Sequence, residues 1–285
     1  MAEAKNPRGA GVHYVVATPI GNPGDITLRA LEVLRKVDLI ACEDTRRTGL
    51  LLAAHRIEKP MLSHFEHNEE RRVPELIERL KAGARVALVT DAGTPAISDP
   101  GYRLVRAAHE AGVRVTAIPG ACAAVAALSI SGIASDRFAF EGFLPPREGA
   151  RRRALEALRG EDRTMIFYEA ARRLGDTLSE MAETLGGDRT AAVIREITKT
   201  HEETLRGSLA ELAARFTREQ ALGEVVIVIE GARDETAATA PALTVQDLLD
   251  AGVSLKHASQ LIAKLTGKSR RDVYQEGLKL RRSQE

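Results

Sequence analysis

The chain has 285 residues, of which 44% are apolar, and a formal net charge of +1. This length predicts one large or two ordinary domains, and the near-zero charge excludes a global attraction to nucleic acid or membranes. The two cysteines fit no metal spacing and suit a reducing, cytoplasmic setting, and no stretch reaches the ~18 apolar residues of a membrane span. With 4% aromatic residues and no Trp, a broad base-stacking platform is also excluded.

Residues 1–11 are interpreted as a flexible tail, because they are polar and lack the apolar centre of a signal peptide. Between residues 12 and 118, short apolar runs alternate five times with segments of helical apolar spacing. The predicted strands are His13–Ala17, Val37–Cys42, Met61–Ser63, the apolar run that begins at Val86, and Val113–Ile118. The predicted helices are Ile26–Lys36, a segment ending near His55, Glu70–Ala82 and Tyr102–Ala111. This alternation is typical of a doubly wound, mainly parallel α/β domain.

One loop organises this first domain. The strand that begins at Val86 leads into Asp91-Ala92-Gly93-Thr94-Pro95 and then, past Asp99, into a helix. Ligands bind at this carboxyl edge of open α/β sheets, and Gly93 lets a ligand approach the backbone closely. Taken alone, the pattern fits an ordinary strand–turn–helix connection equally well.

Two further turns, Thr18–Asp25 and Pro119–Ala123, consist mostly of small residues and converge on the same strand ends. Such walls bind an extended cofactor through backbone hydrogen bonds, although Asp25 is also expected to cap the next helix. The segment Glu43–Arg47 places two acids and two bases after the second strand, and its acids suit the positive end of a helix dipole. The histidines of the loop His64–Asn68 have no third ligand at a suitable spacing, so no metal site is predicted.

From Asp136 the pattern changes and predicts a second α/β domain with a mixed sheet, over residues 119–231. The predicted strands are Phe138–Gly142, Thr164–Glu169, Thr190–Arg195, Glu202–Gly207 and Val225–Glu230. The predicted helices are a small-residue helix ending near Ser131, Ala150–Arg159, Arg172–Thr184 and Ser208–Thr217. The triplet Arg151–Arg153 is interpreted as the solvated start of a helix.

Residues 232–240 have little to bury and are interpreted as a linker. Three helical patterns follow within residues 241–285, at Val245–Ala251, Leu255–Thr266 and Arg270–Leu280. The segment Ser254–Arg282 carries eight Lys and Arg against two acids. A basic helix-turn-helix and a packing appendage with solvated charges fit this pattern about equally.

Five separated motifs carry a family resemblance. They are Ala17-Thr18-Pro19-Ile20-Gly21-Asn22, Glu43-Asp44-Thr45-Arg46, Asp91-Ala92-Gly93-Thr94-Pro95 with Ser98-Asp99-Pro100-Gly101, Phe167-Tyr168-Glu169, and Arg195-Glu196-Ile197-Thr198-Lys199. In this order they resemble the RsmI family, within the tetrapyrrole-methylase (class III) superfamily that uses S-adenosylmethionine. The resemblance covers residues 12–231, and the basic tail is similar to the small helical appendage of RsmI members.

The resemblance implies two α/β domains with S-adenosylmethionine in the interdomain cleft, a homodimer, and 2′-O-methylation of a cytidine ribose in 16S rRNA at the decoding centre. The implied cofactor contacts are Pro19, Asp91, Ala92, Gly93, Ala96, Ile97, Cys122, Ala123, Tyr168 and Ala192. Three departures affect expected contacts: Cys122 replaces a usual hydroxyl, Pro23 a usual Leu, and Ala170-Ala171-Arg172 a usual Ser-Pro-His. A thiol is the weaker hydrogen-bonding group, so the contact at Cys122 is expected to be weakened.

Methylation of a ribose needs positioning and a base for a weakly acidic hydroxyl. The candidate bases are Glu43, Asp44, Asp91, Asp99 and Glu196, and Lys199 and Arg46 are expected to hold the phosphate backbone or lower the pKa of the hydroxyl. The predicted RNA contacts are Arg46, Arg47, Arg151, Arg152, Lys268, Arg270 and Arg271. Because the net charge is small, a preformed ribosomal particle is expected to be preferred over free RNA.

Two alternatives stay open. Tetrapyrrole C-methylation uses the same superfamily, but its enzymes usually carry a Gly-x-Gly-Pro-Gly-Asp-like first turn, which Thr18–Asp25 does not match. A non-enzymatic nucleic-acid-binding sensor would use the basic tail and the α/β body as a ligand detector. Deletion of the residues after Ala240 separates these cases, because a methyltransferase keeps its cofactor binding.

Overall fold

The computed structural model describes residues 11–219, 222–232 and 243–282. The chain divides into two compact units, residues 1–232 and 233–285, which we treat separately. Nearly all of the predicted tail and of the predicted linker lies outside the described residues. Among the helices that the structure describes, none has the length and apolar character needed to cross a membrane.

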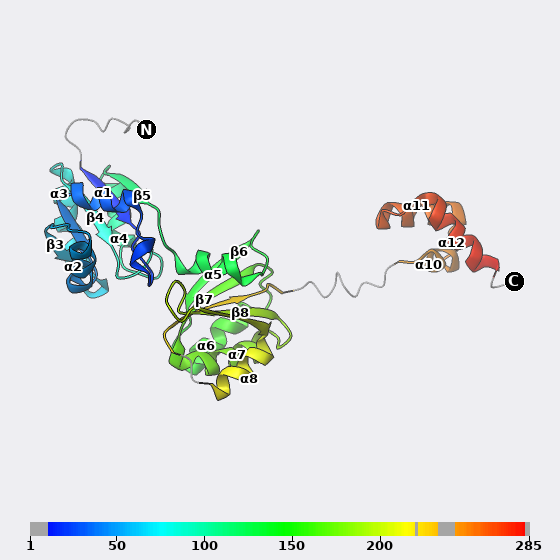
Figure 1. Ribbon diagram of the computed structural model, residues 1–285. Helices are drawn as coiled ribbons and strands as arrows, with labels where there is room; N and C mark the ends of the chain where they lie inside the picture. Colours follow the sequence, from blue (N-terminus) through cyan, green and yellow to red (C-terminus); the bar gives the residue numbers. More distant parts are fainter. Residues whose placement is uncertain (1–10, 220–221, 233–242, 283–285) are drawn as a thin grey trace. The chain divides into compact units, whose positions relative to one another are not determined.

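The first sheet is entirely parallel, with strand order β3-β2-β4-β1-β5 (Figure 1). Its strands are β1 (Val12–Val16), β2 (Leu39–Cys42), β3 (Met61–Ser63), β4 (Arg85–Val89) and β5 (Arg114–Ile118). Its helices are α1 (Leu28–Lys36), α2 (Thr45–Ala54), α3 (Glu69–Lys81) and α4 (Tyr102–Glu110). Because side chains alternate along a strand, Ala87 and Val89 pack with α1 and α2 while Val86 and Leu88 pack with α3 and α4. The predicted doubly wound domain is confirmed.

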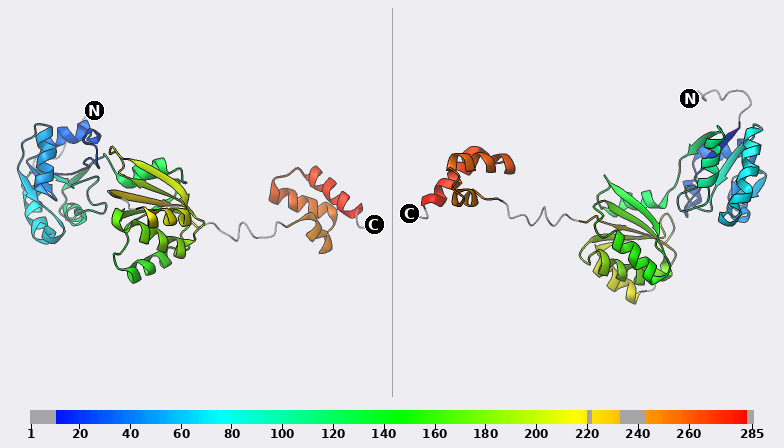
Figure 2. Two further views of the ribbon diagram at one scale, coloured as in Figure 1. Left: turned by 60° about the horizontal axis from the view of Figure 1, so that its bottom comes forward. Right: turned by 180° about the vertical axis from the view of Figure 1, so that it is seen from behind.

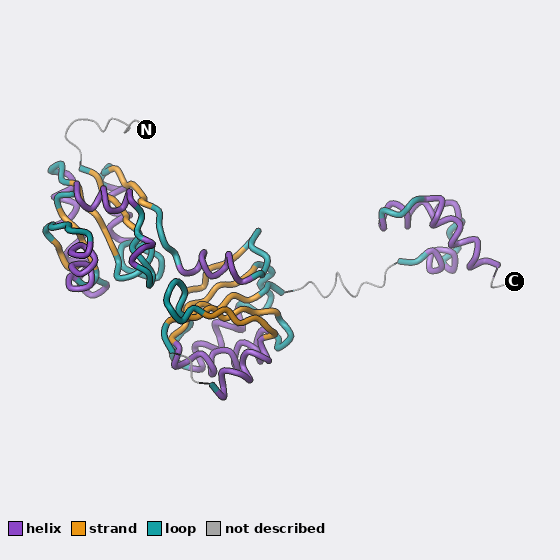
Figure 3. Tube along the Cα trace, viewed as in Figure 1, coloured by secondary structure: helices purple, strands orange, loops and turns teal. Residues whose placement is uncertain are grey.

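The second sheet is mixed, as predicted, with order β6-β7-β10-β8-β9. Its strands are β6 (Phe138–Phe143), β7 (Thr164–Ala170), β8 (Thr190–Arg195), β9 (Glu203–Ser208) and β10 (Glu224–Ile229). Only β6 and β7 pair in parallel among the described strands of this sheet. The helix α5 (Ala123–Ser131) covers one face, and α6 (Glu148–Ala157), α7 (Leu174–Leu185) and α8 (Leu209–Arg218) cover the other (Figure 3).

The strand order places three loops at one edge of the first sheet. The strands β2, β4 and β1 are neighbours, so the segments that follow Cys42, Val89 and Val16 leave from adjacent carboxyl ends. The turn after β1 contains a short 3-10 helix, η1 (Pro23–Asp25). The hydroxyl of Thr27 caps α1 by accepting a hydrogen bond from the Ala30 amide at 3.1 Å, so the expectation that Asp25 caps this helix is wrong.

The C-terminal unit contains the three predicted helices, α10 (Val245–Asp250), α11 (Leu255–Thr266) and α12 (Arg270–Arg282) (Figure 2). Their core consists of Val245, Leu255, Ala258, Ile262 and Val273. A Cβ at Gly277 would lie 2.3 Å from Leu255 Cδ1, so only glycine lets α12 pass this close to α11. The unit therefore has its own packed core.

Candidate active site: two adjoining cavities

Two adjoining cavities lie at the converging loops of residues 1–232. The first has a volume of about 390 Å³, which falls within the range of small-molecule sites, and the second about 270 Å³. Both are lined by Ile20, Ala92 and Glu224, so they meet along a shared wall. The predicted cofactor residues Ala92, Gly93, Ile97, Cys122, Ala123 and Tyr168 line the first cavity, and Pro19, Asp91 and Ala92 line the second.

The loop from Thr90 to Gly101 forms one wall of the first cavity. Thr18 and Gly93 pair as an isolated β-bridge, each amide donating to the other's carbonyl, at 2.9 and 3.1 Å. A Cβ at Gly93 would lie 3.3 Å from Ile20 Cγ2, so glycine leaves room at the cavity floor. Ala96 and Ser98 adopt positive φ angles of 69° and 61°, which are strained for residues with a side chain.

The far end of this loop is anchored by a buried acid. The Glu69 carboxylate accepts a hydrogen bond from the Gly101 amide at 2.8 Å and lies 3.3 Å from His64 Nε2. Burial lowers the pKa of His64, and Glu69 opposes that shift. Sequence reasoning missed Glu69, because an acid in the first turn of a helix is an ordinary feature of helices.

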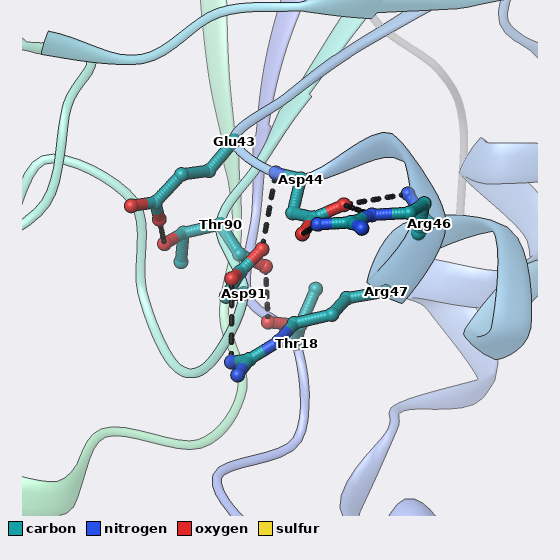
Figure 4. A network of polar contacts seen from close by, with 7 residues as sticks. All are labelled: Thr18, Glu43, Asp44, Arg46, Arg47, Thr90 and Asp91. Carbon is teal, nitrogen blue, oxygen red and sulfur yellow. Dashed lines mark hydrogen bonds and ion pairs between the residues drawn. The ribbon is translucent and has the colours of Figure 1, made fainter.

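An acidic network lies behind the loop (Figure 4). The Thr90 hydroxyl donates to Glu43 at 3.2 Å, and Asp91 accepts from the Asp44 amide at 3.2 Å. Arg47 lies 3.3 Å from the second Asp91 oxygen. The structure thus brings the predicted residues Glu43, Asp44, Arg46, Arg47 and Asp91 together.

Asp44 and Asp99 differ in their charge environments. The Asp44 carboxylate caps α2 by accepting from the Arg46 amide at 2.8 Å, and the Arg46 guanidinium holds the pKa of Asp44 below its usual range. Burial raises the pKa of Asp99 to about 6, with the charges of Glu43 and Asp91 acting in the same direction. Asp99 also lines the first cavity. A carboxylate with a pKa near neutrality and a cavity-lining position is the better candidate base.

Tyr168 forms the opposite wall of the first cavity. Its hydroxyl accepts a hydrogen bond from the Ala124 amide at 3.1 Å, and its ring packs edge-on against Phe140 and Phe143. Burial raises the pKa of Tyr168 to about 12, so the phenol stays neutral at physiological pH. Cys122 precedes α5 beside this ring and makes no capping hydrogen bond with its side chain. The wall is therefore aromatic and apolar around a neutral hydroxyl.

Glu169 fixes the end of this wall. It is 2% exposed, and its carboxylate accepts hydrogen bonds from the Ala170 amide at 2.7 Å, Arg173 Nε at 2.8 Å and the Thr177 hydroxyl at 2.7 Å. Every oxygen of this buried charge is thus satisfied. Glu169 belongs to the family motif Phe167-Tyr168-Glu169, and its pairing with Arg173 depends on the turn from β7 into the 3-10 helix Ala171–Arg173.

The hairpin between β8 and β9 contributes a second cluster. Lys199 Nζ donates to Glu196 at 2.9 Å and to Glu224 at 3.1 Å. Hydrogen bonding by Lys199 lowers the pKa of Glu196, which makes it a weak base. A Cβ at Gly223 would lie 1.9 Å from Glu196 Oε1, so this cluster requires glycine there.

Three predicted residues do not occupy the expected places. Ala192 is fully buried beneath α5, and Ala96 lines neither cavity, so the implied cofactor contacts of these two residues stay predictions. Arg151 is buried and its Nε donates to Glu180 at 2.5 Å, so interpreting it as a solvated helix start and RNA contact is wrong. A charge this buried needs a partner in the protein and presents nothing to a phosphate.

The remaining predicted RNA contacts are exposed. Arg152 lies on the surface of α6, and Lys268, Arg270 and Arg271 lie on the surface of the C-terminal unit. Across the described ranges, the structure contains no group of three or more His, Cys, Asp or Glu arranged to hold a metal ion. His64 and Glu69 form a buried pair instead.

Comparison with known proteins agrees with this geometry. A family model described as Tetrapyrrole (Corrin/Porphyrin) Methylases matches residues 13–213, and one described as RsmI C-terminal HTH domain matches residues 236–281. Among solved structures, a diphthine synthase shares the fold with a TM-score of 0.60 and 19% identity, over 78% of this chain and 90% of that one. A uroporphyrin-III-C-methyltransferase from Thermus thermophilus aligns with a TM-score of 0.54 and 22% identity, over 77% of this chain and 94% of that one.

Curated relatives are similar over nearly the full length. A protein of Pasteurella multocida named Ribosomal RNA small subunit methyltransferase I is 47% identical, over 94% of this chain and 97% of its own. A protein of the same name from Escherichia coli O157:H7 is 46% identical, over 94% of this chain and 95% of its own. The chain therefore belongs to the RsmI family within the tetrapyrrole methylases.

Proposed function

We propose that this chain transfers a methyl group from S-adenosylmethionine to the 16S rRNA of the small ribosomal subunit, at the 2′-oxygen of a cytidine ribose. The observation that carries the proposal is the near full-length similarity to rRNA small-subunit methyltransferases, together with the two family models matched in order. The adjoining cavities supply the separate places that a cofactor and a substrate group need.

The first cavity fits the cofactor. Its lining is mostly apolar and small, and Gly93 lies where a side chain would crowd Ile20. The Thr18–Gly93 bridge would hold the floor, and Ala123 and Tyr168 the opposite wall. The cofactor supplies an electrophilic methyl group on a positively charged sulfur. The aromatic ring of Tyr168 is a favourable neighbour for such a charge.

Asp99 is the base that the geometry favours among the predicted candidates. Its carboxylate lines the first cavity, and its pKa of about 6 leaves it ionised at pH 7 yet able to hold a proton. Asp44 and Glu196 are held by cations, which lower their pKa values and weaken them as bases. Glu43 would act on Asp99 through their shared neighbour Thr90.

Positive side chains would hold the RNA backbone. Arg47 and Arg152 present exposed guanidinium groups, and Lys268, Arg270 and Arg271 do so on the C-terminal unit. Removal of residues 241–285 is expected to keep cofactor binding and to weaken binding of the subunit. We further infer a homodimer acting in the cytoplasm on assembled subunits, which sedimentation equilibrium and cell fractionation test.

Methyl transfer from labelled S-adenosylmethionine tests the proposal. Small subunits from a strain lacking this activity, naked 16S rRNA and a tetrapyrrole precursor serve as parallel substrates. We expect label in subunit rRNA at one alkali-resistant linkage, with less in naked rRNA. Label in the tetrapyrrole alone would reassign the substrate, and cofactor binding without any transfer would favour a sensor.

A further inference from the structure

The second cavity carries polar and charged groups in addition to the implied cofactor contacts Pro19, Asp91 and Ala92. Its lining carries two cations, Arg47 and Lys199, two acids, Asp91 and Glu224, and three threonine hydroxyls from Thr18, Thr48 and Thr90. The first cavity, in contrast, has a largely apolar and small-residue lining. A cavity of about 270 Å³ lies just below the ~300–1,000 Å³ of typical ligand pockets, which suits one sugar with a phosphate.

The two cations come from different halves of residues 1–232. Arg47 lies on α2, with its side chain 70% exposed and 3.3 Å from Asp91. Lys199 lies on the hairpin after β8 and donates to Glu196 and Glu224. Gly21 brings these halves together, because a Cβ there would lie 2.6 Å from Lys199 Cγ. Two cations from separate elements on one cavity match an RNA backbone, which carries a phosphate on each side of a ribose.

The polar groups between the cations suit a sugar. The Thr18 hydroxyl donates to the Thr90 carbonyl at 3.0 Å, and the Thr90 hydroxyl donates to Glu43 at 3.2 Å. Asp91 lines the second cavity, and its carboxylate accepts a hydrogen bond from the Asp44 amide at 3.2 Å. Hydroxyl and carboxylate groups are the partners that ribose hydroxyls need, and the 2′-hydroxyl distinguishes RNA from DNA.

We propose that the second cavity receives the ribose of the target nucleotide, with its flanking phosphates held by Arg47 and Lys199. The inference rests on the proposed function and adds the place of the substrate. The 2′-oxygen then faces the shared wall formed by Ile20, Ala92 and Glu224. In the transfer, this oxygen would bond to the methyl carbon, the carbon–sulfur bond would break with its electron pair left on sulfur, and the hydroxyl proton would pass to the carboxylate of Asp99, which lines the adjoining first cavity.

Filling the second cavity tests the proposal. Leu51 lines only this cavity of the two, whereas its neighbour Leu50 on the same helix is 74% exposed and lines neither. We expect Leu51→Trp to bind S-adenosylmethionine with an affinity within twofold of wild type and to lose at least 100-fold in methyl transfer to small subunits. Leu50→Trp is the matched control and is expected to retain both.

The outcomes separate this inference from the proposed function. Normal transfer by Leu51→Trp would overturn the substrate assignment, and loss of cofactor binding would make the second cavity part of the cofactor site. Wild-type protein that labels no rRNA would instead overturn the proposed function.

Charge removal provides a second test, in case Leu51→Trp fails to fold. Losing a hydrogen bond to a charged group weakens binding about 10- to 100-fold, so Arg47→Gln and Lys199→Gln are each expected to raise KM for subunits by that factor. Each is also expected to reduce the salt dependence of binding by about 0.7 in log–log slope, with cofactor affinity unchanged. Arg106→Gln, an exposed ion-paired arginine on α4, is the control. An unchanged KM in both variants would contradict the proposal.

Discussion

The two walls of the first cavity are held by opposite means. The wall from Thr90 to Gly101 contains strained residues, Ala96 and Ser98, and is anchored at its far end by one acceptor, Glu69. The opposite wall ends at Glu169, a buried carboxylate whose partners satisfy it fully. A substitution at Glu169 should therefore lower the free energy of unfolding, whereas a substitution that frees the Thr90–Gly101 loop should lower cofactor affinity.

The largest expected effect is at the second wall. Glu169→Leu leaves the half-buried Arg173 guanidinium without its carboxylate and the buried Thr177 hydroxyl without its acceptor, which costs up to about 3–5 kcal/mol. Urea unfolding monitored by circular dichroism measures the change. Glu169→Gln keeps one oxygen acceptor in the same place, so it is expected to lower the free energy of unfolding by less than Glu169→Leu does. If Glu169→Leu unfolds at the same urea concentration as wild type, Glu169 does not stabilise the fold and the proposed difference between the two walls is contradicted.

A smaller effect is expected at the first wall. Glu69→Leu removes the acceptor of the Gly101 amide, a charged hydrogen bond worth about 1.5–3 kcal/mol. Because this bond anchors the strained loop, we expect the dissociation constant for S-adenosylmethionine to rise by at least tenfold. Calorimetric titration measures it, and Glu69→Gln should restore most of the affinity. Equal affinity in Glu69→Leu would show that the loop needs no anchor.

The pH dependence of stability provides a third test. Asp99 has a folded pKa of about 6, raised from 3.8, so its ionisation opposes folding. The penalty is absent below pH 4, grows between pH 4 and 6, and is complete above pH 6. Asp99→Asn is therefore expected to raise the melting temperature at pH 7.5 and to leave it unchanged at pH 3.5. Differential scanning calorimetry at both values measures this.

Asp38 is the control for that prediction, because its pKa is shifted in the opposite direction on folding. Arg85 lowers the pKa of Asp38, so the ionised carboxylate favours folding above its usual pKa of 3.8. We expect Asp38→Asn to lower the melting temperature at pH 7.5. Equal shifts for the two variants would contradict the assignment of Asp99 to a buried, desolvated position.

The smallest effect is expected outside both walls. Arg152 is exposed and lies 3.7 Å from Glu156, a surface pair of the kind worth under about 1 kcal/mol. Arg152→Ala is expected to change the free energy of unfolding by less than about 0.5 kcal/mol. Its effect on subunit binding should appear only at low salt, in filter-binding assays. A large loss of stability would place Arg152 with its buried neighbour Arg151.

Short apolar runs bounded by turn residues predicted all ten described strands, because a strand buried between helix layers is apolar along its whole length. Strand order is set by non-local pairing, so it became visible only in the structure. The burial of Arg151 was likewise not predictable from the local sequence. Three adjacent arginines look alike in sequence, and the one that is buried is selected by Glu180, which lies 29 positions away.

The motifs located the site but not the roles within it. Glu43, Asp91 and Asp99 follow the ends of β2 and β4, which are neighbours in the sheet, so their convergence follows once the strand order is known. The difference between the pKa values of Asp99 and Asp44 could not be predicted from the sequence, because it depends on the burial of Asp99 and on the Arg46 partner of Asp44. Glu69 carried no distinguishing pattern, since its partner Gly101 lies 32 positions away.

Titration of S-adenosylmethionine into wild-type protein and into a variant filled at the first cavity tests the central claim most directly. Ala123 lines that cavity, whereas Val125 on the same helix is 55% exposed and lines neither cavity. We expect one binding site per chain in wild type and in Val125→Phe, and no binding site in folded Ala123→Phe. Undiminished binding by Ala123→Phe would contradict it and place the cofactor elsewhere.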